Sequence, residues 1–282
     1  MLLVTGASGE LGTLIAGHLA GRDDVLLGTR EPGSGGGRRR IDFDEPDTLA
    51  EGFTGVDTLL MISAGQGEDD EVITRHEAAI SAAEKAGVRH VVYTSLSGDG
   101  DHLTYALAHR WTERRLRESA LPAWTVLRNG LYAELLAFLA APGTDGVITA
   151  PLGSGRLAAV ARADLAEVAV RVALDPARHM SRTYELVGEV PVGGAELAEA
   201  ASATYAPGTP AGARARIAAS GALPFQVPML VGTYSAIAAG FMDGSGIPAP
   251  ERGALRELLG RAPRPAAEAY TEAINSAARA TS

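Results

Sequence analysis

The chain has 282 residues, of which 46% are hydrophobic and 21% are charged, and this balance suits one large α/β domain with a smaller addition. It contains no cysteine, which excludes disulfides, thiolate metal sites and cysteine nucleophiles. The formal net charge of -9 argues against a nucleic-acid partner, because such binding depends on basic side chains that neutralise phosphates. Without a basic leader or an apolar segment of about 20 residues, we expect a cytoplasmic protein with no membrane partner.

Short apolar runs alternate with helical patterns over the first half of the chain. An apolar run at residues 2–4 is followed by a glycine-spaced turn at 6–12 and by a helical pattern that ends near residue 19. This alternation indicates a Rossmann-type, doubly wound parallel α/β sheet with helices on both faces. The further elements that it predicts are a strand at 25–27, a helix near 47–52, a strand at 58–62, a helix at 70–86 that ends at Gly87, a strand at 91–94, a helix at 105–119 and a strand at 124–127.

Beyond Gly130 the order of elements is less regular, with a helix opened by Asp164 and a further strand at 183–187. Residues 193–282 have the pattern of helices and loops rich in alanine, glycine and proline. We therefore expect a Rossmann domain over residues 1–180 and a smaller, mostly helical substrate-side domain over 181–282. Residues 131–150 are expected to belong to the Rossmann domain and to contribute to the cleft in which the substrate binds.

The glycine-spaced turn has the residues that a dinucleotide-binding corner needs. Gly6 permits the tight turn, Gly9 removes a side chain where a pyrophosphate approaches the backbone, and Gly12 lets the helix pack closely on the strand. The N-terminus of the following helix presents unsatisfied N–H groups to the anion. A glycine-rich turn without a ligand is the alternative. The predicted cofactor contacts here are Thr5, Gly6, Ser8, Gly9, Glu10, Leu11 and Gly12.

The end of the second strand decides which dinucleotide is preferred. An acid there would hold the ribose diol, whereas an arginine accommodates a 2′-phosphate. This strand ends with Thr29 and Arg30, and the acid Glu31 comes one residue later. A charge-assisted contact from Arg30 is worth about 1.5–3 kcal/mol, so we expect NADPH to be preferred over NADH, although a solvated arginine is the alternative. The glycines at 33–37 and the arginines at 38–40 predict a flexible, basic loop.

Two further segments are expected on the cofactor side. Asp42 follows the short third strand, where it could cover the adenine edge or equally serve as a turn or helix-capping carboxylate. Ser63, Ala64 and Gly65 follow a strand at the carboxyl edge of the sheet, where the ligands of such sheets bind.

The whole chain resembles the NmrA-like atypical short-chain dehydrogenases, and within them the NAD(P)H:quinone oxidoreductase type 2 branch. The glycine turn alone specifies a superfamily, whereas Tyr93–Leu96 and Leu127–Gly130 together are typical of this branch. The resemblance implies NADPH across the strand ends and an apolar, quinone-sized cleft. The similar segments are 5–12, 59–63, 82–88, 93–96, 109–113, 125–130, 161–164, 184–186 and 258–261.

The resemblance also implies four residues on the nicotinamide side, namely Thr94, Ser95, Asn129 and Gly130. Thr94 and Asn129 are equally consistent with strand-end residues that satisfy buried backbone groups.

The residues of the usual reductase chemistry are incomplete. Standard members of the superfamily use a Tyr-x-x-x-Lys pair, whereas here His109 stands four residues after Tyr105, and the only lysine, Lys85, lies on another predicted helix. A quinone needs a positioned acid less, because its product is phenol-like with a pKa near about 10. We therefore predict hydride transfer from NADPH to a quinone or similar electron-poor acceptor.

The catalytic candidates are Tyr105, His109 and Asn129. His109 could donate a proton because histidine titrates near neutral pH, although a surface histidine on an amphipathic helix explains it as well. The segment 223–230, with Tyr234 and Phe241, predicts an apolar wall over the acceptor or, equally, ordinary helix packing. The alternative functions are an NADP(H)-binding redox sensor without turnover and a tailoring reductase. The expected assembly is a monomer or homodimer with a small-molecule substrate.

Overall fold

The computed structural model describes residues 1–33, 36–64 and 67–280. The chain folds into two compact units: unit 1 comprises residues 1–95, 107–128 and 165–184, and unit 2 comprises 96–106, 129–164 and 185–282. The chain crosses between the units several times, whereas the sequence suggested a single boundary near residue 180. The segment 96–106 is the clearest difference, because it lies between two parts of unit 1 in the sequence.

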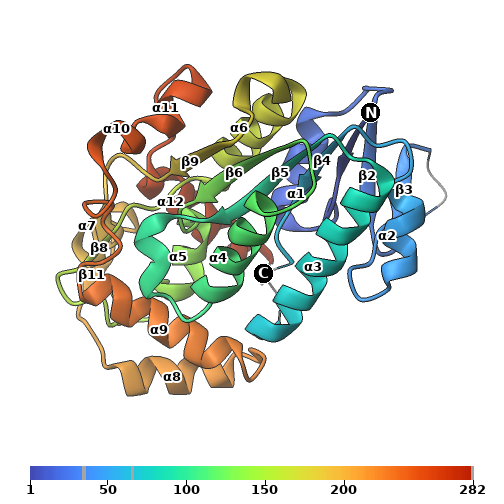
Figure 1. The fold of residues 1–282 in the computed structure, drawn as a ribbon. Coiled ribbons are helices and arrows are strands. Elements are labelled where there is room, and N and C mark those ends of the chain that lie inside the picture. The colour runs from blue at the N-terminus through green and yellow to red at the C-terminus, as the bar shows by residue number, and fades with distance from the viewer. Residues whose placement is uncertain (34–35, 65–66, 281–282) are drawn as a thin grey trace. The chain divides into compact units, whose positions relative to one another are not determined.

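A parallel sheet lies at the centre of the Rossmann fold (Figure 1). Its seven strands have the order β3-β2-β1-β4-β5-β6-β9, and the pairs from β3 to β5 are parallel. The chain moves outward in opposite directions from β1 and β4, so the topological switch point lies between these two strands. This confirms the doubly wound α/β fold. The strands are β1 (Leu2–Val4), β2 (Val25–Thr29), β3 (Arg38–Arg40), β4 (Thr58–Met61), β5 (His90–Leu96), β6 (Ala123–Asn129) and β9 (Arg182–Leu186).

Helices cover both faces of the sheet, with α2, α3 and α4 on one face and α1 and α6 on the other (Figure 1). Alternation along the strands explains the first of these layers, since Leu3, Leu59 and Met61 are fully buried in one core with α2 and α3. Buried alternate residues of this kind are what a sheet needs to carry a helical layer. The helices are α1 (Glu10–His18), α2 (Pro46–Gly52), α3 (Asp69–Ala86), α4 (Ala106–Arg117) and α6 (Arg162–Leu174).

The ends of α3 show why the local sequence was informative. At its start, the side chains of Glu68 and Glu71 form a reciprocal capping box with backbone N–H groups. At its end, Gly87 has a φ of 73°, a left-handed conformation that glycine adopts without strain. The predicted end of this helix at Gly87 is confirmed.

The basic segment 38–40 is not a loop, which corrects the prediction from its composition. Arg38, Arg39 and Arg40 form β3 and pair in parallel with β2, from Leu27 to Thr29. The Arg39 guanidinium donates to the carbonyl oxygens of Gly52 and Thr54, at 2.5 and 2.7 Å, and so satisfies the end of α2. Backbone pairing and this contact outweigh the charge repulsion of three adjacent arginines.

Unit 2 has its own apolar core, which includes Leu136, Leu197, Ile237 and Tyr270. The strand β9 belongs to the main sheet, although the sequence placed residues from 181 onward in the smaller domain. The two-residue strands were not predicted, because they are too short to give a periodic signal. Unit 2 contains α5 (Ala133–Leu139), β7 (Val147–Ile148), β8 (Arg156–Leu157), β10 (Val192–Gly193), α7 (Gly194–Ala200), β11 (Thr204–Tyr205), α8 (Pro210–Ala219), α9 (Gln226–Ala238), α10 (Ala249–Arg252), α11 (Ala254–Leu259) and α12 (Ala266–Ala280).

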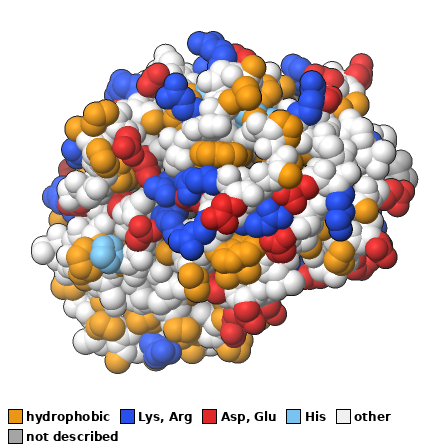
Figure 2. Space-filling view, viewed as in Figure 1, with side chains coloured by type: hydrophobic (Ala, Val, Ile, Leu, Met, Phe, Trp, Pro, Cys, Tyr) orange, Lys and Arg blue, Asp and Glu red, His pale blue; other side chains and the backbone are white. Residues whose placement is uncertain are grey.

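The surface carries charges of both signs. On the face shown in Figure 2, basic side chains gather near the middle with acidic side chains directly beside them. Exposed pairs such as Arg256 with Glu189 show this local compensation. Within the described ranges, none of the helices has both the length and the apolar character needed to cross a membrane.

Candidate functional site

The glycine turn after β1 forms an open corner in unit 1. Gly6 has a φ of +61°, and Gly6, Ser8 and Gly9 are exposed. A Cβ added at Gly12 would lie 2.1 Å from the Gly6 carbonyl oxygen, so the close approach of α1 to the turn admits no side chain there. The geometry assigns Gly6 and Gly12 the conformational roles that the motif predicts.

The first turn of α1 is arranged to receive an anion. Gly9 is its N-cap, and no side chain in the described part of the chain caps this end. Helix N-termini without a cap leave N–H groups unsatisfied and carry a positive partial charge. The bare corner and the uncapped helix therefore fit the diphosphate of NAD(P)H, which supplies a transferable hydride when it is bound.

Arg30 lies beside the corner, at the end of β2. Among the described residues, no hydrogen bond or ion pair of its exposed guanidinium is observed, whereas Arg75 forms a two-point ion pair with Asp44, at 2.7 and 3.0 Å. The bond from Arg75 holds the pKa of Asp44 below its ordinary value, and the nearby charge of Arg30 adds to this effect. Arg30 is thus close to this acidic segment and still available to a further anion.

Asp42, which follows β3, and Thr29, the last residue of β2, differ in whether their side chains have hydrogen-bond partners. The Asp42 carboxylate accepts the N–H of Asp44 at 3.1 Å, which is the geometry of a local turn. Thr29 is 3% exposed, and its Oγ1 has no hydrogen-bond partner within the described ranges. A cofactor contact of Asp42 stays a prediction.

The segment after β4 and the end of β5 also lie at the carboxyl edge. Thr94 Oγ1 accepts the N–H of Ser63 at 3.0 Å, and the N–H of Ala64 donates to His76. These side chains already have structural tasks, and their predicted contacts with the cofactor stay predictions. Gly65, predicted in the same segment, lies outside the described residues.

Glu113 is the centre of a buried charge cluster that the sequence did not reveal. Its side chain is 1% exposed and accepts hydrogen bonds from Ser95 at 2.7 Å, Arg110 at 2.8 Å, Arg117 at 3.0 Å and Arg128 at 2.7 Å. Burial by itself would raise the pKa of Glu113, but the bonds and charges of Arg128, Ser95 and Arg110 outweigh it and lower the pKa to about 2. The hydroxyl proton of Ser95 is therefore engaged within this cluster.

The catalytic candidates Tyr105 and His109 have different partners. Tyr105 lies 3.4 Å from Thr233 Oγ1, and burial raises its pKa to about 12. His109 Nδ1 lies 2.9 Å from the hydroxyl of Tyr93, and burial, with the charge of Arg110, lowers its pKa to about 4. Its imidazole is thus neutral near pH 7, which weakens the case for His109 as a proton donor.

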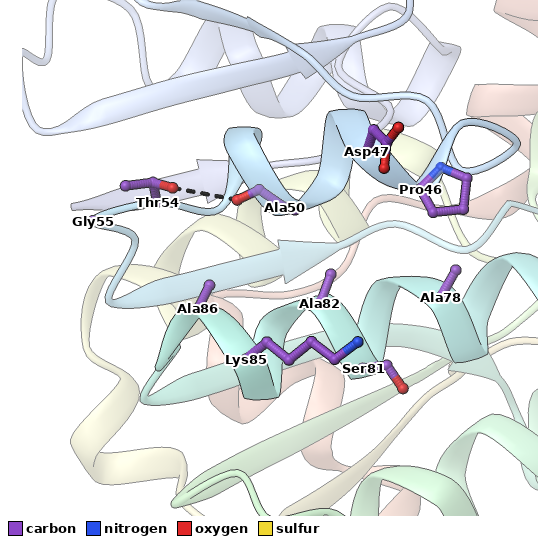
Figure 3. Close-up of a pocket in the computed structure, with 10 residues that line it drawn as sticks. All are labelled: Pro46, Asp47, Ala50, Thr54, Gly55, Ala78, Ser81, Ala82, Lys85 and Ala86. Atoms are coloured by element: carbon purple, nitrogen blue, oxygen red, sulfur yellow. Dashed lines mark hydrogen bonds between the residues drawn. The ribbon is translucent and has the colours of Figure 1, made fainter.

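Lys85 does not complete a Tyr–Lys pair either. It lines a groove of about 480 Å³ between α2 and α3, where its side chain lies along α3 toward Ser81 (Figure 3). None of the predicted cofactor-binding residues lines this groove. Its lining residues are Pro46, Asp47, Ala50, Thr54, Gly55, Ala78, Ser81, Ala82, Lys85 and Ala86.

Asn129 and Gly130 belong to unit 2 by their contacts. The Asn129 carbonyl oxygen accepts the N–H of Ser97 at 2.9 Å, and the N–H of Gly130 donates to Leu186 at 2.8 Å. The side chain of Asn129 is buried, and its Oδ1 has no hydrogen-bond partner in the part of the chain that the structure describes. Such an atom is costly to leave unpaired, so Asn129 stays a candidate for contact with a ligand.

The expected apolar wall divides into core residues of unit 2, namely Val227, Leu230 and Tyr234, and exposed residues such as Leu223 and Phe241. Leu230 and Tyr234 of α9 are 8% and 1% exposed and belong to the main core cluster. Phe241 is exposed and stacks on His102, with ring centroids 3.9 Å apart. Helix packing therefore accounts for Leu230 and Tyr234, while a ligand contact of the exposed Phe241 stays a prediction.

Sequence reasoning also missed His76, although the sequence contained a signal. His76 lies on the same face of α3 as Val72, Ala79, Ile80 and Ala83, all of which are buried. A histidine at a core position of an apolar helix face must find hydrogen-bond partners inside the protein. For Glu113 the sequence held a partial signal, because Arg110 and Arg117 stand three and four residues away on the same helix, whereas Arg128 of β6 is brought to it only by the fold.

Comparison with known proteins identifies the family. Residues 6–176 match the model of the NAD(P)H-binding family. Quinone oxidoreductase 2 of Escherichia coli is 34% identical over 201 residues, which cover 67% of this chain and 69% of that protein. The NmrA-like family domain-containing oxidoreductase flvB of Aspergillus flavus is 32% identical over 187 residues, which cover 60% of each chain.

Solved structures agree over almost the full length. The triphenylmethane reductase of Citrobacter sp., complexed with NADP(H), superposes with a TM-score of 0.85 at 28% identity, covering 96% of this chain and 99% of that one. The quinone oxidoreductase of Escherichia coli, complexed with NADPH, superposes with a TM-score of 0.83 at 29% identity and the same coverage. The chain belongs to the NAD(P)H-binding family and is an NAD(P)H-dependent oxidoreductase of the NmrA-like, quinone oxidoreductase 2 type.

Proposed function

We propose that the protein uses NADPH to reduce a quinone or similar electron-poor acceptor by hydride transfer. The observation that carries this proposal is the bare corner at Gly6–Gly12 with the available guanidinium of Arg30 beside it. A diphosphate at the helix N-terminus and a 2′-phosphate on Arg30 would satisfy both features together.

The arrangement of possible proton donors supports a quinone-like acceptor. Tyr105 has a raised pKa, His109 is neutral near pH 7, and Lys85 lies in the α2–α3 groove. A ketone would need a positioned acid, because an alkoxide product is strongly basic. A quinone yields a phenol-like product, and binding geometry then contributes most of the acceleration.

Stopped-flow mixing of the protein with NADPH and a panel of acceptors tests the function. The panel contains menadione and benzoquinone, together with an azo dye and a triphenylmethane dye, because relatives are named for reducing such dyes. We expect acceptor-dependent loss of NADPH absorbance, with quinones among the substrates. No oxidation across the panel, with unequal affinities for NADP⁺ and NADPH by calorimetry, would contradict the enzyme and support a redox sensor.

A further inference from the structure

Three consecutive backbone N–H groups after β4 are held by side chains from three different elements. Backbone pairing within the sheet ends with β4 at Met61, so the next residues need other partners. The acceptors come from the end of β1, from β5 and from α3. The pairs are Ile62 with Thr5 Oγ1, Ser63 with Thr94 Oγ1 and Ala64 with His76 Nε2, each at 3.0 Å.

The bond pattern assigns the protonation state of His76. Because the N–H of Ala64 can only donate, Nε2 of His76 must be the unprotonated nitrogen. The proton then lies on Nδ1, which donates to Thr112 Oγ1 at 2.8 Å, and the Thr112 hydroxyl in turn donates to the carbonyl oxygen of Ala108. The Ser63 hydroxyl, 3.5 Å from Nε2, can also donate to it, so the neutral Nδ1–H tautomer is consistent with every contact of the ring.

The surroundings of His76 keep its ring neutral and in place. His76 is fully buried, with Tyr93 and Phe43 in edge-to-face contact at 5.4 and 6.5 Å between ring centroids. Burial, with smaller contributions from His109 and Arg75, lowers its pKa to about 3. The acceptor for the Ala64 N–H is therefore present throughout the ordinary pH range.

The held segment lies next to the glycine turn. A Cβ built on Gly6 would lie 3.6 Å from Ile62 Cβ, so the residue after β4 packs on the glycine turn. Both lie at the switch point between β1 and β4, where ligands of doubly wound sheets bind. A displacement of residues 62–64 would therefore also displace the backbone at Gly6.

We propose that His76 is a positioning residue of the cofactor site, which holds the segment after β4 against the glycine turn through the N–H of Ala64. The inference rests on the proposed use of NADPH, since it assigns His76 an effect on cofactor affinity. Thr5 and Thr94 complete the anchor, but they bind neighbouring N–H groups and not that of Ala64.

Two substitutions separate the two bonds of His76. The Oε1 of His76→Gln reaches the place of Nε2 and can still accept from Ala64, whereas the shorter His76→Asn keeps a donor near Nδ1 for Thr112 and cannot reach Ala64. We expect His76→Asn to weaken NADPH binding about fivefold to tenfold, as for the loss of one hydrogen bond, and His76→Gln to stay within about twofold of the unaltered protein. Equal affinities of the two variants would overturn the proposal.

His90 provides the matched control. It is also a buried histidine, bound to Thr125 Oγ1 at 2.7 Å, but it is the first residue of β5, at the opposite edge of the sheet. We expect His90→Asn to lower the thermal midpoint without changing NADPH affinity. A loss of affinity equal to that of His76→Asn would show general destabilisation and refute the positioning role.

Amide hydrogen exchange in the cofactor-free protein tests the anchor separately. We expect the Ala64 N–H to exchange faster in His76→Asn than in His76→Gln, and unchanged exchange would refute the anchor. Failure of the unaltered protein to bind NADPH would instead contradict the proposed function. If His76→Asn does not fold, a second variant, Thr94→Val, removes the acceptor for the neighbouring Ser63 N–H. The anchor would be overturned if this variant had the same amide exchange and the same NADPH affinity as the unaltered protein.

Discussion

The polar groups at the two edges of the parallel sheet in unit 1 differ in whether they have partners within the protein. At the amino edge, the N-terminal ammonium of Met1 pairs with Asp57 at 2.7 Å, and His90 is bound to Thr125. At the carboxyl edge, the N-terminus of α1 has no side-chain cap, and Arg30 makes no observed ion pair, among the described residues. The polar groups named at the amino edge are thus paired by folding alone, whereas the N-terminus of α1 and Arg30 keep unused donors among the described residues.

This difference has a physical cause. In a parallel sheet, the helices that follow strands begin at the carboxyl edge, so their unsatisfied N–H groups and positive dipole ends collect there. A side-chain cap would satisfy them, and glycine at the N-cap provides none. The unused donors at the N-terminus of α1 lie on the side of the sheet where ligands of doubly wound folds bind.

The largest expected effect concerns Glu113, a buried carboxylate whose hydrogen bonds are made to side chains of unit 1. Glu113→Gln leaves three arginines without their shared carboxylate, and we expect the free energy of unfolding at pH 7 to fall by about 3 kcal/mol. Urea denaturation measures this. The control Glu189→Gln, in an exposed ion pair with Arg256, should lose about 0–1 kcal/mol.

The same group predicts a dependence on pH. The pKa of Glu113 is lowered from 4.5 to about 2 in the folded protein, so its contribution is complete above about pH 5 and is lost as the pH falls toward 2. Stability of the unaltered protein should therefore fall more steeply over this range than that of Glu113→Gln. Parallel pH profiles would show that the cluster does not stabilise the fold.

Arg30 offers the next test, because it contrasts directly with Arg22 at the other end of β2. Arg30→Ala should weaken NADPH binding by about 1.5–3 kcal/mol, or roughly ten- to a hundredfold, with little change for NADH. Arg22, which is already paired with Asp24, should give no change when replaced by alanine. Calorimetric titration of each variant with both cofactors measures the preference. Equal losses for NADPH and NADH would mean that Arg30 does not contact the 2′-phosphate.

The last comparison concerns two glycines of α1, of which Gly17 should give the smaller change in stability when it is replaced by alanine. Gly12→Ala places a Cβ 2.1 Å from a backbone oxygen and should cost about 1–3 kcal/mol of unfolding free energy, with loss of NADPH affinity. Gly17→Ala meets no atom within 4 Å and should instead stabilise the helix by about 0.4–1 kcal/mol. A Gly12→Ala variant that binds NADPH normally would contradict the corner as the phosphate site.

Local patterns predicted the first part of the fold well. The strand at 2–4, the turn at 6–12 and α3 with its end at Gly87 all depend on neighbours in the sequence, through hydrophobic periodicity and glycine conformation. The segment 38–40 was misjudged, because three arginines in a row indicate a solvated loop until the pairing with β2 is known. Strand formation there depends on a partner that is distant in sequence.

The candidate site divides in the same way. The corner at Gly6–Gly12 and the position of Arg30 follow from spacing within a single βαβ unit, so the sequence alone determined them. The task of His76 was decided only by the tertiary structure, because its partners lie outside α3. For Glu113, the fold adds Ser95 and Arg128 to the two arginines of its own helix. Burial then sets their charge states, making one ring neutral and one carboxylate permanently ionised near neutral pH. Desolvation and long-range hydrogen bonds arise only once the chain has folded, which is why no local pattern reports them.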